Sequence, residues 1–302
     1  MYLVVSDIHL YESNSYRVKA FHSLLKKLNI YRRKFNISDL VICGDFFNKY
    51  TSISISSILK TASLFKKFKQ VWLLCGNHDT PYRDTKESLL DIFSLLQNVR
   101  VINSSWYNEE DNVGFISYYQ PFDSDVLDWL YNCKILFTHK DIKELNKFND
   151  EDFAISLNDY PQDCYVFNRH LRHHKVMESK EGGQYIQLGA PYLTRFSDAS
   201  ELNRYVFLVS PNLKENFTWK RFPLNICAYE GHNLKAAEFI IPYSEKDKIE
   251  EVKLESLDEM RIQNMTDIID AFEKLEISDK LKRIGRRIIE HVINTKIEPD
   301  KL

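Results

Sequence analysis

Glycine and proline are scarce in this sequence, with eight of each in 302 residues, and cysteine occurs only five times. The cysteines are far apart and form no C-x-x-C pair, which argues against a disulfide framework and is typical of a reducing compartment. No stretch approaches the roughly 20 consecutive apolar residues of a transmembrane helix. The first residues, MYLVVSDIHL, carry no basic region before their short apolar run, unlike a signal peptide. We therefore expect a cytoplasmic protein without a membrane span.

An excess of charge of one sign is also missing. The formal net charge is −2, which argues against a general polyanion binder, so any contact with nucleic acid would need a local basic patch. Hydrophobic residues make up 44% of the chain, enough for a full core. Many Lys, Ile and Asn residues beside few Gly and Pro residues are compatible with a phage or an AT-rich bacterium. The expected location is then a bacterial or phage-infected host cell.

Short apolar runs alternate with amphipathic stretches in the first half of the chain. The stretches at helical spacing are 17–31, 55–69 and 87–97. The apolar runs that predict buried strands between them are 2–6, 39–44, 71–76, 113–118 and 134–139. This alternation predicts an α/β sandwich whose sheet is at least partly parallel. Later runs at 164–168, 184–189 and 204–210 lack long helices between them, which predicts a sheet that ends in antiparallel strands.

The hydrophobic pattern of the sequence changes twice after the main domain, which we place at 1–212. A small β capping segment is predicted at 213–252, from the runs 216–225 and 236–243. Apolar residues then recur at helical spacing, which predicts a helical C-terminal tail at 253–302, with its helix over about 255–297.

Side chains that can bind metals or act as acids and bases follow five of the predicted strands. Taken singly, an Asp or Asn after a strand usually caps a turn, and a lone His is usually a surface or core residue. Ligands in α/β sheets, however, bind at the carboxyl ends of the strands, where all five groups would meet. Mixed carboxylate and imidazole donors suit Mn, Fe or Zn ions. The residues concerned are Asp7, His9, Asp45, Asn77, His78, Asp79, His139 and His170.

In order, the motifs SDIHL, GDFFN, GNHD and TH resemble the calcineurin-like metallophosphoesterase superfamily, whose signature is D-x-H, G-D, G-N-H-[DE], a lone His and G-H-x-H. Within it the chain is similar to the nuclease subunit of the SbcCD complex and its phage counterparts, because QYIQLGAPYLTRFSD (184–198) resembles the segment after their last motif. The motifs cover roughly 1–210. The resemblance implies a four-layer αββα sandwich with a small β cap and a helical tail.

The resemblance also implies a two-metal hydrolysis of phosphodiester bonds at DNA ends, with Mn²⁺ as the favoured ion. Asp45 would bridge the two divalent ions, and Asp7 and His9 would hold the first of them. The implied ligands of the second ion, besides Asp45, are Asn77, His139 and His170.

His78 has a different implied role, because it would face the scissile phosphate and not a metal. It would stabilise developing negative charge and help the leaving oxygen depart. Asp79 would either orient His78 or cap the next turn, and Asn48 would play a supporting or structural part.

The last motif departs from the family pattern, since Arg169-His170-Leu171-Arg172 stands where G-H-x-H is expected. An arginine cannot replace the second histidine, which in the family completes the shell of the first ion, because guanidinium has only donors and stays protonated. Three outcomes remain open. His173 or His174 replaces the lost ligand; or the first ion binds weakly and Arg172 contacts substrate phosphate; or the site is inactive and the protein is a scaffold.

The expected partners follow from the same resemblance. DNA would contact a cationic rim formed by Arg169, Arg172, Lys175 and Arg195. The helical tail would dock on the coiled coil of an SbcC-like ABC ATPase, and a homodimer is also possible. Two alternatives to a nuclease subunit are a phosphodiesterase for small molecules and a catalytically degenerate interaction subunit.

Overall fold

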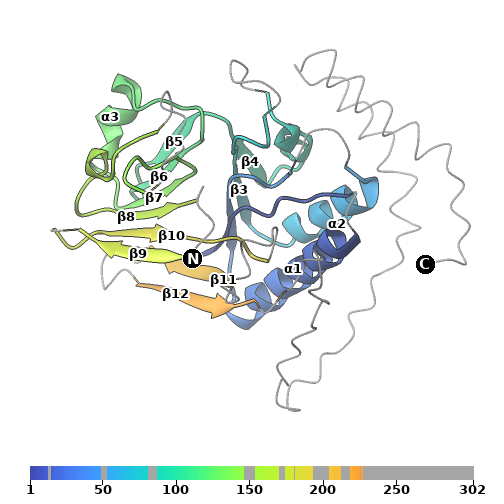
Figure 1. Cartoon of the computed structure of the whole chain (residues 1–302). Coiled ribbons are helices and arrows are strands. Elements are labelled where there is room, and N and C mark those ends of the chain that lie inside the picture. Colours follow the sequence, from blue (N-terminus) through green and yellow to red (C-terminus); the bar gives the residue numbers. More distant parts are fainter. Residues whose placement is uncertain are drawn as a thin grey trace, which may run out of the picture.

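The computed structural model describes residues 1–12, 15–48, 53–80, 87–145, 154–169, 174–179, 181–192, 204–211, 218–224 and 226. Within these residues the chain forms two six-stranded mixed sheets (Figure 1). The predicted tail at 253–302 and the predicted run at 236–243 lie outside the described residues.

The first sheet has the strand order β12-β11-β1-β2-β3-β4. Strands β1 to β4 are parallel to one another, whereas β11 pairs antiparallel with both β1 and β12. The predicted antiparallel end is therefore confirmed for the run 204–210, which forms β11, but not for 164–168 and 184–189, which form β8 and β10 and pair parallel in the second sheet. The bounds of the strands in the first sheet are β1 Tyr2–Val5, β2 Asp39–Cys43, β3 Gln70–Leu74, β4 Val99–Ile102, β11 Tyr205–Ser210 and β12 Thr218–Pro223.

The second sheet has the order β5-β6-β7-β8-β10-β9, with parallel strands β6, β7, β8 and β10 between two antiparallel edge strands. Its strands are β5 Ser105–Asn108, β6 Val113–Ile116, β7 Ile135–Thr138, β8 Tyr165–Asn168, β9 Lys175–Glu178 and β10 Gln184–Gln187. The helical elements are α1 Ser15–Lys34, α2 Ile55–Phe65, α3 Ser124–Leu130 and the short 3₁₀ helices η1 Leu89–Leu95 and η2 Leu157–Asp159.

Strand β1 shows why the strands in the first half of the chain appear in the sequence as unbroken apolar runs. Its side chains alternate between two buried faces, as required for a strand covered on both sides. Leu3 and Val5 pack in the cluster that includes residues of α1 and α2, and Tyr2 and Val4 pack in the cluster shared with the second sheet. The second sheet packs its other face against α3. The layers are thus helices, sheet, sheet and helix, in the α/β arrangement that the sequence predicts (Figure 1).

The strand predicted over 216–225 forms as β12, which is hydrogen bonded to β11 along its whole length. This part of the predicted capping segment therefore extends the first sheet. The boundary between 1–212 and 213–252 stays a prediction, because most of 213–252 lies outside the described residues. In the part of the chain that the structure describes, no helix combines the length and apolarity needed to cross a bilayer.

Candidate metal centre at the strand ends

Five strands from both sheets deliver polar side chains to one rim. Ser6 to His9 follow β1, Asp45 follows β2, and Asn77 to Asp79 follow β3 of the first sheet. His139 follows β7 and Arg169 follows β8 of the second sheet. Because these strands run parallel within each sheet, their carboxyl ends lie at the same edge. Two groups of possible metal ligands meet there: Asp7, Asp45 and His139, and His9, Asp45 and His78.

The backbone of the loops after β1 and β2 is held in an unusual conformation. Asp7, His9 and Asp45 have φ angles of 50°, 44° and 48°, in the left-handed region that few non-glycine residues adopt. Backbone hydrogen bonds tie the two loops together, from Asp7 N to the Gly44 carbonyl (3.1 Å) and from His9 N to the Asp45 carbonyl (2.9 Å). Such conformations persist only where the surrounding structure enforces them, and they concentrate at functional sites.

Two glycines allow the loops to approach closely. A Cβ atom on Gly76 would lie 2.1 Å from Oδ1 of Asp45, and one on Gly44 would lie 2.2 Å from Nδ1 of His139. Gly44 also has a φ of +76°, which favours glycine. The glycines of the G-D and G-N-H-D motifs are therefore required by packing around the site.

Asp45 lies at the centre of the cluster and is 2% exposed. Its Oδ2 is 3.4 Å from Nε2 of His139 and 3.6 Å from Nε2 of His9, and its Oδ1 accepts a hydrogen bond from the backbone N–H of His78 (2.9 Å). Burial alone would raise the pKa of Asp45, but the nearby histidines, His139 first, hold it well below its usual range. Asp45 is thus a buried, ionised carboxylate shared by several imidazoles.

His139 is fixed from the opposite side of its ring. Its Nδ1 lies 2.9 Å from the Cys43 carbonyl, so Nδ1 carries the proton and Nε2 faces Asp45. Burial would lower the pKa of His139, but the charges of Asp45 and Asp7 raise it to about 9. The second nitrogen of a metal-binding histidine is commonly held by a carbonyl in this way.

Asn77 contributes a neutral oxygen to the same edge. Its Oδ1 is buried and has no hydrogen-bond partner among the described residues. Leaving a buried amide oxygen unsatisfied costs about 1–3 kcal/mol, which a bound cation would remove. Asp45 and His139 lie in one group of possible ligands, and Asn77 adds a buried amide oxygen after the neighbouring strand β3. Carboxylate, amide and imidazole donors of this kind suit a divalent transition metal.

Asp7 has a different neighbour from the one that the sequence suggested. Its Oδ1 lies 3.5 Å from Nε2 of His9, but its Oδ2 forms an ion pair with Nε of Arg169 at 2.7 Å. Ser6 Oγ also donates to Oδ2 of Asp7, at 2.7 Å. Burial would raise the pKa of Asp7, but the Arg169 guanidinium, followed by the hydrogen bond from His9, holds it well below its usual range. At the first ion position the described residues therefore fit a cation less well.

Arg169 corrects one sequence-based expectation. It was assigned to a cationic rim for DNA, but it is 1% exposed and paired with Asp7. Its position directly after β8, where the other strands also end in a site residue, is the signal that could have identified it. Lys175 of the same predicted rim is exposed, on the edge strand β9. Arg172 and Arg195 lie outside the described residues.

His78 and Asp79 are held by the backbone of the β2 loop. Nδ1 of His78 lies 2.8 Å from the Asn48 carbonyl, and its ring stands edge to face with that of His9 at 4.8 Å between centroids. The Asp79 carboxylate accepts hydrogen bonds from the backbone N–H groups of Phe47 (2.9 Å), Gly76 (3.0 Å) and Phe46 (3.3 Å).

These contacts match neither of the two roles predicted for Asp79, which were to orient His78 or to cap the next turn. Its described side-chain hydrogen bonds all go to backbone N–H groups, so it fastens the β2 and β3 loops to each other. Burial and the charge of Asp45 raise its pKa to about 7. His78 is oriented by Asn48, in agreement with a supporting part for that residue.

The predicted ligand His170 and the predicted phosphate contact Arg172 lie outside the described residues, as does His173. His174 is described, and it belongs to neither group of possible ligands. Its Nδ1 lies 2.8 Å from the Gln187 carbonyl, and its ring packs on Phe207 (5.3 Å) and Tyr205 (5.5 Å). Of the two histidines that might replace the lost ligand, His174 is thus occupied in packing between strands.

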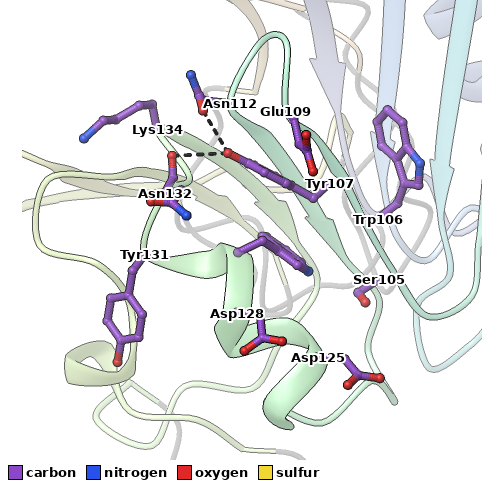
Figure 2. Close-up of a pocket in the computed structure, with 11 residues that line it drawn as sticks. Ser105, Trp106, Tyr107, Glu109, Asn112, Asp125, Asp128, Tyr131, Asn132 and Lys134 are labelled. Atoms are coloured by element: carbon purple, nitrogen blue, oxygen red, sulfur yellow. Dashed lines mark hydrogen bonds between the residues drawn. The ribbon is translucent and has the colours of Figure 1, made fainter.

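A hollow of about 850 Å³ lies away from the strand-end cluster, beside β5 and α3 (Figure 2). Tyr107 lines it, stacked on Trp129 at 5.1 Å and donating a hydrogen bond to Asn112 at 2.8 Å. Asp125 and Asp128 of α3 also face it. None of its lining residues belongs to the cluster around Asp45, so the strand-end cluster remains the candidate centre.

Comparison with known proteins identifies the family. The profile of calcineurin-like phosphoesterases matches residues 2–207. A search of curated proteins finds no match. Among solved structures, a dimetal phosphatase from Danio rerio is 12% identical, with 63% of this chain and 87% of that chain covered and a TM-score of 0.41.

Two further solved structures are similar at the same level. An archaeal phosphodiesterase is 13% identical, with 73% of this chain and 99% of that chain covered and a TM-score of 0.38. The nuclease MPE of Pseudomonas putida is 16% identical, with 63% and 72% covered and a TM-score of 0.35. The profile match spans more than half of the sequence and includes the described strand-end cluster. The chain belongs to the calcineurin-like phosphoesterase family.

Proposed function

We propose that this protein is a metal-dependent phosphodiesterase that cuts DNA, as the nuclease subunit of a complex resembling SbcCD. The observation that carries the proposal is the buried cluster in which Asp45 lies within 3.6 Å of both His9 and His139. Ionised carboxylate and imidazole groups gathered at strand ends form a binding site for hard or borderline cations. Family membership supports phosphoester hydrolysis as the reaction class.

A divalent cation bound here would polarise phosphoryl oxygens and increase the acidity of a water molecule. Asp45, Asn77 and His139 would hold it, with His170 as a further predicted ligand, and Mn²⁺ is our favoured ion. The protein keeps these donors in place through the Cys43 carbonyl, which fixes the ring of His139, and through Gly76, which allows the β3 loop to reach Asp45. Little reorganisation is then needed on binding.

His78 is proposed to act on the phosphate. Since Nδ1 faces the Asn48 carbonyl, which only accepts hydrogen bonds, Nδ1 carries a proton and Nε2 remains for the substrate. In the imidazolium form, Nε2–H can donate to a phosphate oxygen as negative charge develops and pass its proton to the leaving oxygen. This assignment makes His78 the proposed general acid.

DNA is favoured over a small phosphodiester by the segment 184–198, which resembles the corresponding segment of SbcD-type nucleases. Its described part lies against the site, because the buried Tyr192 side chain donates a hydrogen bond to the Ile8 carbonyl, between Asp7 and His9. The proposed partner is an SbcC-like ABC ATPase that docks on the predicted tail at 253–302. A phosphodiesterase for small molecules is the alternative enzyme, and no described contact favours it.

The test is cleavage of end-labelled duplex and single-stranded DNA with Mn²⁺, with and without the ATPase partner. We expect cleavage that EDTA abolishes and that an Asp45→Asn variant lacks. A bis(p-nitrophenyl) phosphate assay in parallel separates the enzyme alternatives. Hydrolysis of the small ester with no cleavage of DNA under any condition would sink the nuclease proposal.

A non-catalytic interaction subunit is the second candidate, and the ion pair between Arg169 and Asp7 favours it. A protein that has lost metal chemistry can keep the fold and the partner surface. Metal analysis distinguishes the two, because a scaffold of this kind is expected to retain no divalent ion after dialysis.

A further inference from the structure

The ion pair between Arg169 and Asp7 joins the ends of two strands from different sheets. Asp7 follows β1 of the first sheet, and Arg169 follows β8 of the second sheet. The Nε of Arg169 is 2.7 Å from Oδ2 of Asp7, and the two residues are 1% and 2% exposed. The guanidinium thus lies on the carboxylate of the residue that the family resemblance assigns to the first ion.

Neither partner can easily leave this arrangement. The backbone N–H of Arg169 bonds to the Thr138 carbonyl (3.3 Å), and that of Asp7 bonds to the Gly44 carbonyl (3.1 Å). The guanidinium keeps its charge at any ordinary pH. Moving it away would leave the Asp7 carboxylate buried without its partner, and breaking a buried ion pair is strongly destabilising.

The charge of the site then suits one dication better than two. Asp7 and Asp45 contribute two negative charges and Arg169 contributes one positive charge, so these three groups together carry −1. One divalent cation would bring that sum to +1, which a phosphodiester anion neutralises. Two divalent cations would bring it to +3, with the ion nearest Asp7 beside a guanidinium and little water to screen the repulsion.

We infer that the chain binds a single divalent cation, held by Asp45, Asn77 and His139, and that the Arg169 guanidinium takes the place of a second cation beside Asp7. The inference rests on the metal site of the proposed function but not on the substrate. Arg169 acts in it as a positioning residue, because it fixes and neutralises Asp7 from the side away from His9. The Nε2 atom of His9 remains between the two carboxylates, 3.5 Å from Oδ1 of Asp7 and 3.6 Å from Oδ2 of Asp45.

The test is a metal count on the full-length protein. The protein is stripped with a chelator, equilibrated with Mn²⁺, dialysed and analysed by mass spectrometry, and electron paramagnetic resonance then separates isolated from exchange-coupled ions. For the wild type we expect about one Mn²⁺ per chain and an isolated six-line spectrum, where a two-metal site would give about two coupled ions.

Variants test whether the charge of Arg169 is what excludes a second ion. Arg169→Met removes the charge at similar length and should raise the count to about two at the same free Mn²⁺, with a coupled spectrum. Asp7→Asn should leave the count at about one, because Arg169 already occupies the Asp7 carboxylate and the ion is held by the other donors. Arg100→Met is the matched control, because Arg100 is exposed and covers the rings of Trp106 (4.7 Å) and Trp72 (5.7 Å), away from the strand-end cluster, and the metal count should not change.

Each result decides the inference. Two ions or none in the wild type, loss of the ion in Asp7→Asn, or a count of one in folded Arg169→Met would overturn it. If either variant of this buried pair does not fold, the wild-type count still gives the answer. One bound ion with no cleavage of DNA would reject the proposed function and leave this inference standing.

Discussion

Asp7 and Asp45 are two buried aspartates at neighbouring strand ends, both with left-handed backbone, yet their side chains have different partners. Asp45 faces imidazoles, with His139 at 3.4 Å and His9 at 3.6 Å. Asp7 shares His9 with it but pairs its other oxygen with Arg169 at 2.7 Å. Both carboxyl groups have a pKa well below the usual range, one through histidines and the other mainly through an arginine.

The difference matters because imidazoles and guanidinium respond differently to a metal ion. A histidine can lose its proton and become a ligand, so the charge around Asp45 can be exchanged for a cation. An arginine keeps its proton, so the charge beside Asp7 is permanent. Two carboxylates that look equivalent in the motifs therefore offer a cation unequal sites.

The largest expected effect comes from Asp45→Asn. The change removes the carboxylate that faces His9 and His139, so we expect the bound ion to be lost and DNA cleavage to fall by about 10³-fold or more, equivalent to about 4 kcal/mol of transition-state stabilisation. Asp7→Asn is the matched variant and should cost roughly 10–100-fold with the ion retained. Equal losses of metal in both variants would contradict the comparison.

His78→Gln comes next. It removes the proposed general acid, so cleavage should fall by about 10²–10⁴-fold, while the metal count stays at the wild-type value because His78 is not a proposed ligand. Cleavage rate and metal content are measured on the same preparation. If the ion is lost as well, His78 belongs with Asp45 and His9 as a ligand, as their proximity would allow.

Gly76→Ala tests the packing on the Asp45 side. The new Cβ would lie 2.1 Å from Oδ1 of Asp45, so either the carboxylate or the loop must move. We expect a loss of about 1–3 kcal/mol in the free energy of unfolding, measured with urea, together with weaker Mn²⁺ binding. Gly182→Ala is the control for Mn²⁺ binding, because its Cβ meets nothing within 4 Å, so its φ of +87° should lower stability without changing the affinity for Mn²⁺. Unchanged Mn²⁺ affinity in Gly76→Ala would show that Asp45 tolerates displacement.

Ser6→Ala should have the smallest effect, on the Asp7 side. The single hydrogen of the Ser6 hydroxyl can be donated either to Asp7 or to the Cys43 carbonyl, both of which lie within reach, and that carbonyl keeps its contact with His139. We expect a loss of about 1 kcal/mol in the free energy of unfolding and an unchanged metal count. A loss of the ion would mean that the orientation of Asp7 controls metal binding after all.

Most strands of the structure were predictable because their periodicity is strong. β1, β2 and β3 are apolar runs followed by motif residues, and they form within two residues of the predicted bounds. β9 was missed, since Lys175–Glu178 is an edge strand with mostly exposed side chains and so shows no apolar pattern. α3 was missed because seven residues carry too few turns for a helical stripe, although the Asp123 side chain caps it.

The site also has parts that the sequence could predict and parts that it could not. Within each sheet, the motif residues could be placed at one edge from the sequence, because parallel strands have their carboxyl ends together. The contact of Asp79 with the backbone of Phe46 and Phe47 could not, because it depends on how closely the β2 and β3 loops approach.

The sequence alone was enough for the α/β class, for placing Asp7, Asp45 and Asn77 after parallel strands of one sheet, and for the loss of the last motif's glycine and second histidine. For Arg169, which follows β8, the sequence predicted a place on a cationic rim that contacts DNA. Only the tertiary structure decided that Arg169 is buried on Asp7. That contact joins strand ends from two different sheets. The packing of one sheet on the other brings these ends together, and the hydrophobic periodicity along each strand does not encode that packing.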